Sequence, residues 1–160
     1  MPEPTPYALS QLFGQLIGRK VAFTQAKPSV DLKTKRIYGI YNVLPHSTSI
    51  VVEADLALLG SFAGVLVGLP DASVKERLQA NPIDELLRDA IYEVLNIASA
   101  VVTDEGRAIF TKMVDAPIYI DGDAGKMFKK PDHRSYFTVT VDGYQGGRFS
   151  IFSQFIPVHV

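Results

Sequence analysis

The sequence predicts a single α+β domain in which long helices pack on one antiparallel sheet, forming two layers. Three observations support this fold class. The chain has 160 residues, 47% of them hydrophobic, which suits one compact domain with a buried core. Two segments with helical spacing of apolar residues are each followed by short runs rich in Val, Ile, Tyr and Phe. Turn residues such as Asp142-Gly143 separate these runs and favour antiparallel hairpins.

The first half of the chain is expected to open with a helix over residues 7–17. Thr5-Pro6 suits its N-terminal cap, and Gly18 is well placed to end it. Three extended segments are expected next, over Lys20–Gln25, Arg36–Val43 and Ser49–Glu53. A more apolar helix is expected over Asp55–Val67, and it stops near Gly68.

The second half begins in the same way. Asn81-Pro82 repeats the start of a cap followed by proline, Ile83–Val102 is the longest helical pattern in the chain, and Gly106 follows it. Strand-like runs are expected at Ala108–Lys112, Pro117–Ile120, Tyr136–Val141 and Phe149–Phe155. Turns at Asp121-Gly122 and from Asp142-Gly143 to Gly146-Gly147 favour hairpins between them.

The two halves can be aligned with each other. A shift of 82 residues places the first helix on the longest one with apolar positions matched, and Gly18 then falls on Ala100. An internal duplication of an α-β-β unit explains this agreement, and so does the general pattern of any two amphipathic helices. No low-complexity linker divides the chain. We therefore expect one domain over residues 1–160, with halves at about 5–70 and 80–157.

The composition argues against several classes of function. Lys and Arg number 16 against 17 Asp and Glu, so the chain lacks the basic surplus that drives nucleic-acid binding. The absence of Cys excludes disulfides, thiolate metal sites and a cysteine nucleophile. The N-terminus does not resemble a signal peptide, and the longest apolar run, Leu56 to Leu69, is too short to span a bilayer. We expect a cytoplasmic protein that binds neither nucleic acid nor membrane.

The helix expected over residues 83–102 carries the candidate functional residues. On a helical wheel its apolar residues fill one face, made of Ile83, Leu86, Leu87, Ala90, Ile91, Val94, Ile97, Ala98 and Val101. Glu93 and Asn96 lie on the opposite face, three residues and about 60° apart. Asp89 precedes them on the same stripe, and the small Ala100 follows them. Asn is disfavoured inside helices, so this pair indicates a functional site; the alternative is simple solvation of an exposed face.

The segment Asp89–Ala100 resembles the E-x-x-N helix of the CheC/CheX phosphatases of bacterial chemotaxis. That family pairs two α-β-β halves in pseudo-symmetry on a shared antiparallel sheet, and the resemblance extends from about Leu9 to Phe155. The first-half equivalents of the pair are Gln11 and Gly14, which lack the acid and the amide. The chain is therefore more similar to the CheX type, which carries the motif once. It departs from the family at Ala100, where glycine is usual.

The resemblance implies a function and a mechanism. The substrate would be the phosphoaspartate of a CheY-like response regulator, whose own site supplies Mg²⁺, so no cofactor or metal is expected on this chain. Asn96 would hold a water in line with the phosphorus, and Glu93 would pair with the active-site lysine of the regulator. Asp89 and Ala100 would lie against the partner. A homodimer is also expected, formed by edge pairing of Phe149–Phe155.

Two alternatives remain at this stage. A domain of the same fold could dock a signalling or motor protein without hydrolysis. An unrelated domain could carry E-x-x-N by coincidence, and its two long helices would then show no pseudo-two-fold relation.

Other candidate sites have weaker support. His46, His133 and His159 lie far apart, so only the fold could assemble them into a zinc site or a catalytic triad. Residues 121–125 begin like a calcium loop but lack its closing Glu, which favours a turn that ends a strand. A basic cluster is expected to be a solvated loop or, less favoured, a docking point for an acidic partner; it consists of Lys126, Lys129, Lys130 and Arg134.

Overall fold

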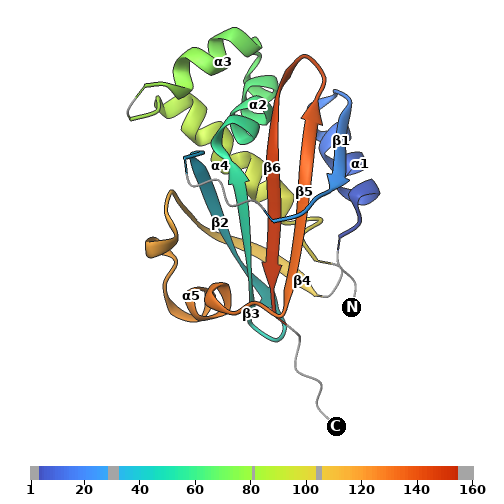
Figure 1. Ribbon diagram of the computed structural model, residues 1–160, viewed down its shortest axis with the longest axis vertical. Coiled ribbons are helices and arrows are strands. Elements are labelled where there is room, and N and C mark those ends of the chain that lie inside the picture. Colours follow the sequence, from blue (N-terminus) through green and yellow to red (C-terminus); the bar gives the residue numbers. More distant parts are fainter. Residues whose placement is uncertain (1–3, 29–32, 81, 104–105, 155–160) are drawn as a thin grey trace.

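A six-stranded antiparallel sheet forms the centre of the molecule (Figure 1). The computed structural model describes residues 4–28, 33–80, 82–103 and 106–154. The strands are β1 (Val21–Gln25), β2 (Arg36–Leu44), β3 (Thr48–Asp55), β4 (Arg107–Val114), β5 (His133–Val141) and β6 (Tyr144–Ser153). Their order across the sheet is β1-β5-β6-β3-β2-β4. The predicted α+β class, with long helices on an antiparallel sheet, is confirmed.

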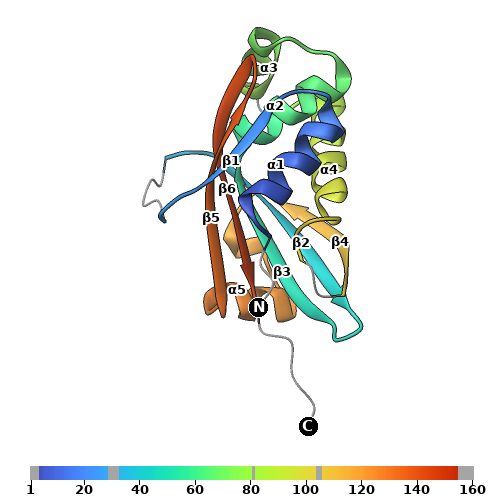
Figure 2. The same ribbon diagram turned by 90° about the vertical axis from the view of Figure 1, so that its right-hand side faces the viewer.

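The long helices gather on one face of the sheet (Figure 2). Helix α1 (Pro6–Ile17) starts where the sequence predicts, because the Thr5 hydroxyl accepts a hydrogen bond from the Ala8 amide. It ends at Gly18, whose φ of 67° is the left-handed conformation that glycine adopts without strain. Helix α2 (Leu56–Val67) is buried along most of its length, as its apolar composition predicts.

Helix α3 (Asp71–Leu78) is absent from the sequence-based expectation. Its residues are mostly charged or small, and Val74 is its one fully buried side chain. The segment therefore lacks the apolar periodicity that predicts a helix. The Cγ2 of Val74 reaches the backbone of Gly64 in α2, a contact that leaves no room for a side chain at that glycine. Close helix–helix packing therefore holds α3 in place.

Helix α4 (Glu85–Ala98) is shorter than the predicted segment at both ends. Its N-cap is Asp84, which accepts a hydrogen bond from the Leu87 amide at 3.0 Å, so Pro82 lies before the helix. Asn81, the predicted cap, lies outside the described residues. Residues 99–102 form turns that follow the helix.

Two further expectations are wrong, both in the segment between β4 and β5. Residues Pro117–Tyr119 form a short 3₁₀ helix, η1, where a strand was expected. Asp121-Gly122 begins helix α5 (Gly122–Lys129), so it is no hairpin turn. Helix α5 packs on the other face of the sheet against β3 and β6, where Met127 joins a second small core with Val51 and Phe152 (Figures 1 and 2).

The turn between β5 and β6 is shorter than predicted. It consists of Asp142-Gly143, and Gly146-Gly147 belong to β6. A side chain at Gly146 would collide with the Val139 carbonyl oxygen, next to the irregularity in the pairing of β5 with β6. Close approach across the hairpin explains Gly146, whereas Gly147 lies close to the side chains of Asp55 and Leu58. The predicted last strand ends at Ser153, and its final residue, Phe155, lies outside the described residues.

The strand order has an internal two-fold relation. Exchanging β1 with β4, β2 with β5 and β3 with β6 turns the order β1-β5-β6-β3-β2-β4 into its own reverse. Each half contributes a hairpin to the middle of the sheet, and β3 meets β6 at the centre. The outer strand of each half pairs with the hairpin of the other half. The sheet is thus a pseudo-symmetric arrangement of two interlocked halves.

The central place of β6 overturns one expectation. Its residues pair with β3 on one side and with β5 on the other. A strand with both neighbours in place has no free row of backbone groups, so the segment predicted to dimerise by edge pairing cannot do so.

Candidate functional site on helix α4

Helix α4 presents one polar stripe to solvent. Its buried side chains are Leu87, Ala90, Ile91, Val94, Leu95 and Ala98. Most of the predicted apolar face is therefore inside, although Leu86 is 52% exposed. All four residues of the predicted site are exposed, namely Asp89, Glu93, Asn96 and Ala100. Ala100 lies in the turn that follows α4, so it does not continue the helical row as the sequence predicted. We refer to these four residues as the α4 stripe.

Glu93 and Asn96 leave their polar atoms available to a partner. They lie three residues apart, so their side chains project from neighbouring positions on the helix surface. Neither side chain forms a hydrogen bond or ion pair with another residue of the described part of the chain. A carboxylate accepts hydrogen bonds and attracts a cation, whereas an amide both donates and accepts. The pair can therefore hold a positive group and orient a water at adjacent points.

A side chain of the sheet supports this part of α4. The Tyr41 side chain, which is 1% exposed, rises from β2, and its hydroxyl donates a hydrogen bond to the Leu95 carbonyl. That carbonyl belongs to the last turn of the helix, next to Asn96, where carbonyls have no partner within the helix; those of Asn96, Ile97 and Ala98 accept from the turn that follows. Tyr41 is a support of the site that the sequence analysis missed, because a strand tyrosine gives no sign of its partner 54 residues away.

An exposed aromatic residue borders the stripe. Tyr92 is 44% exposed, and its ring centroid lies 4.7 Å from that of Phe110 in β4. Phe110 in turn packs on Tyr41, with centroids 5.3 Å apart. These contacts fix the side of α4 that faces β4.

Helix α1 shows what the equivalent position looks like without the motif. With the shift of 82 residues, buried Leu9 and Phe13 correspond to buried Ile91 and Leu95. Gln11 is exposed, like its counterpart Glu93. Gly14, the counterpart of Asn96, carries no side chain. The two helices therefore share a burial pattern, and α4 alone carries the acid and the amide.

The other sequence candidates within the described residues do not converge on a site, and His159 lies outside the described residues. Among the described residues, no group of three or more His, Asp and Glu side chains is placed to hold a metal ion. The basic cluster of Lys126, Lys129, Lys130 and Arg134 is exposed, at the end of α5 and the start of β5. No helix of the described part is both long and apolar enough to cross a membrane.

Similar folds occur in proteins named FliM and FliY. A FliM from H. pylori, solved in complex with SpeE, matches with a TM-score of 0.63 and 10% sequence identity, over 93% of this chain and 81% of that chain. FliY from Thermotoga maritima matches with a TM-score of 0.55 and 12% identity, over 90% and 81%. FliM in the H. pylori FliG–FliM complex matches at 0.50 and 14%, over 94% and 87%.

These likenesses define the fold class. At such low identities they show the fold alone, which is that of the FliM middle domain, and the activity has to be argued from the site. No family model matches the sequence, and no curated protein matches it.

Proposed function

We propose that the protein is a phosphatase that removes the phosphoryl group from the aspartate of a CheY-like response regulator. The observation that carries the proposal is the α4 stripe, where Glu93 and Asn96 are exposed, adjacent and unpaired within the described part of the chain, on a helix whose opposite face is buried in the core. Phosphoryl transfer depends mainly on positioning and electrostatics, so a fixed acid and amide suffice on this side.

In this mechanism the stripe docks over the phosphorylated site of the regulator. The Asn96 amide orients a water in line with the phosphorus, and the Glu93 carboxylate pairs with the lysine of the regulator. The regulator supplies Mg²⁺. The carboxylate of Asp89 and the small side chain of Ala100 lie at the two ends of the contact, where Ala100 lets the partner approach the helix.

The test measures phosphate release from a phosphorylated CheY-like regulator with the wild-type protein and its variants. Asn96→Ala is expected to lower the stimulated rate about 100-fold, because the attacking water is no longer oriented. Glu93→Ala is expected to act in the same direction. Gln11→Ala, at the equivalent exposed position of α1, is the matched control and should behave like wild type. Unchanged release with Asn96→Ala would contradict the proposal.

Docking of another protein without hydrolysis is the second candidate function. It is favoured by the FliM structures of the same fold, which were solved in complexes with SpeE and FliG. Titration of the regulator by calorimetry separates the two functions. A docking domain would bind without accelerating phosphate release, whereas in a phosphatase Asn96→Ala would retain binding and lose the acceleration.

A homodimer remains a prediction, although it cannot form by edge pairing of β6 as first expected. Among the described strands β1 and β4 end the sheet, so only these two offer a free edge for pairing between copies. Light scattering should give the mass of two chains. The mass of one chain would contradict the prediction.

A further inference from the structure

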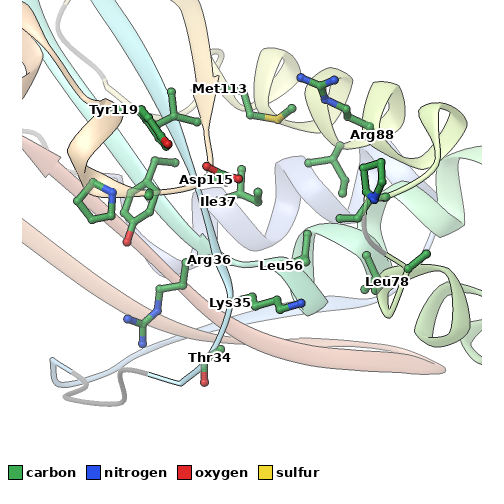
Figure 3. A pocket seen from close by; sticks show the side chains of 18 of the residues that line it. Thr34, Lys35, Arg36, Ile37, Leu56, Leu78, Arg88, Met113, Asp115 and Tyr119 are labelled. Carbon is green, nitrogen blue, oxygen red and sulfur yellow. The ribbon is translucent and has the colours of Figure 1, made fainter.

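A cavity of about 870 Å³ lies on the other side of α4 from the proposed phosphatase site (Figure 3). It forms where the start of β2, the end of β4 with η1, and helices α2 and α4 meet. Arg88 and Ile91 line it from α4, about 140° around the helix from the midpoint between Glu93 and Asn96. Its volume falls in the range of small-molecule sites, roughly 300–1,000 Å³.

One part of the cavity wall is apolar. It is formed by Ile37, Leu56, Leu78, Ile83, Ile91 and Met113. Leu56 and Ile91 also belong to the main core, so this wall is continuous with the interior of the domain. A ligand that covered it would remove apolar surface from water, which favours binding.

The charges along the cavity are strongly unbalanced. Among the described residues that line it, the cations are Lys33, Lys35, Arg36 and Arg88, and Asp115 is the one carboxylate. Arg36 is engaged by Asp55, with 3.5 Å between the Nε and the carboxylate oxygen. Lys35 and Arg88 form no ion pair with any residue in the described part of the chain. The chain as a whole carries 16 cations and 17 anions, so this local excess is unusual.

We propose that this cavity binds a small amphipathic anion, with a carboxylate or phosphate head on an apolar chain. The apolar chain lies against the wall formed by Leu56, Ile91 and Met113. The head is attracted by the cations that border the cavity, which are Lys35, directly before β2, and Arg88 of α4 (Figure 3). Charge complementarity selects an anion, and the apolar wall selects one with a hydrocarbon body.

Octyl phosphate, used below its micelle concentration, is a suitable probe for calorimetric titration. Octanol lacks the charge, octyltrimethylammonium reverses it, and inorganic phosphate lacks the apolar chain. The proposal expects octyl phosphate to bind at least tenfold more tightly than each of the other three, because it alone uses both parts of the cavity. Equal binding of octanol, or equal binding of inorganic phosphate, would overturn it.

Charge variants locate the binding. Lys35→Gln and Arg88→Gln should each weaken octyl phosphate binding about tenfold. Asp115→Asn should strengthen it, because it removes the carboxylate that repels the head. Lys126→Gln, an exposed cation on α5, is the matched control and should leave the affinity unchanged. All of these side chains are exposed, and thermal unfolding checks that each variant folds. An affinity for octyl phosphate that stays unchanged in the Lys35, Arg88 and Asp115 variants would overturn the proposal. This outcome does not depend on Glu93 or Asn96.

Discussion

At the scale of single residues, Tyr41 connects the sheet to the candidate site. It is buried beneath α4, and its hydroxyl is bonded to the Leu95 carbonyl beside Asn96. The bond satisfies a helix-end carbonyl that would otherwise be buried without a partner. The side chain thus fixes the height and angle of the last turn of the helix, on which the Asn96 amide depends.

Removing this hydroxyl should weaken the fold. Tyr41→Phe is expected to lower the free energy of unfolding by about 1–2 kcal/mol, because the buried Leu95 carbonyl loses its partner. Urea denaturation measures the change. Tyr7→Phe is the control, since Tyr7 is 73% exposed and should change nothing measurable. A Tyr41→Phe variant as stable as wild type would show that the hydroxyl bond contributes no net stability.

The same residue predicts a pH dependence. Burial raises the pKa of Tyr41 above its ordinary value of 10.0. Below pH 10 Tyr41 is neutral in both the folded and the unfolded protein, so the stability that it contributes is fully present. As the pH rises further, the unfolded chain loses the proton and the folded protein keeps it, so stability falls by about 1.4 kcal/mol per pH unit. The stability advantage of wild type over Tyr41→Phe should therefore shrink between pH 9.5 and 11, and a constant advantage would contradict this.

At the scale of elements, the contact of α2 with α3 depends on one missing side chain. Gly64→Ala would place a methyl group against Val74 and is expected to cost about 1–2 kcal/mol, as overpacking outweighs the better helix propensity of alanine. Val74→Ala opens the space that the methyl group needs. The double variant should be less destabilised than the sum of the two single ones, by at least about 0.5 kcal/mol in urea denaturation. Strict additivity would show that the two residues do not compete for space.

Local signals explain which elements the sequence predicts. Helices α1 and α4 have strong amphipathic patterns, and Thr5 and Gly18 mark the limits of α1 correctly. Helix α3 lacks such a pattern, because its burial depends on contacts with α2. Residues 117–120 have the composition of a strand, but proline and the following α5 divert them into a 3₁₀ turn.

The functional sites also include a part that the sequence predicts and a part that it does not. The exposure of Asp89, Glu93 and Asn96 follows from helical geometry alone and can be predicted from their spacing. The cavity draws on residues from 33 to 119, and no short segment contains enough of it to be recognised. Tyr41 was missed for the same reason, since its importance depends on a contact made only in the folded chain.

At the scale of the whole molecule, the exchange of outer strands binds the two halves into one cooperative unit. Strand β1 of the first half completes the sheet beside β5, and β4 of the second half completes it beside β2. Neither half could keep its own outer strand paired if the other half unfolded.

Equilibrium unfolding should therefore be two-state. Circular dichroism, which reports on the helices and the sheet, and tyrosine fluorescence should give the same midpoint in urea. A fragment covering residues 5–70 alone should be unfolded, because it contains β1 without the strand that β1 pairs with. Two separate transitions, or a folded fragment, would contradict this.

The pairing of β1 also determines when the protein can finish folding. Val21 lies opposite Val141, so after β1 has left the ribosome it has to wait for the synthesis of β5 before its partner exists. Contacts between residues so distant in sequence form slowly, because the entropy of the intervening chain is lost before the contact contributes any favourable free energy. During synthesis the apolar side chains of β1, Val21 and Phe23, remain without their sheet partners. Strand β1 is thus exposed to aggregation and to chaperone binding until β5 has been synthesised.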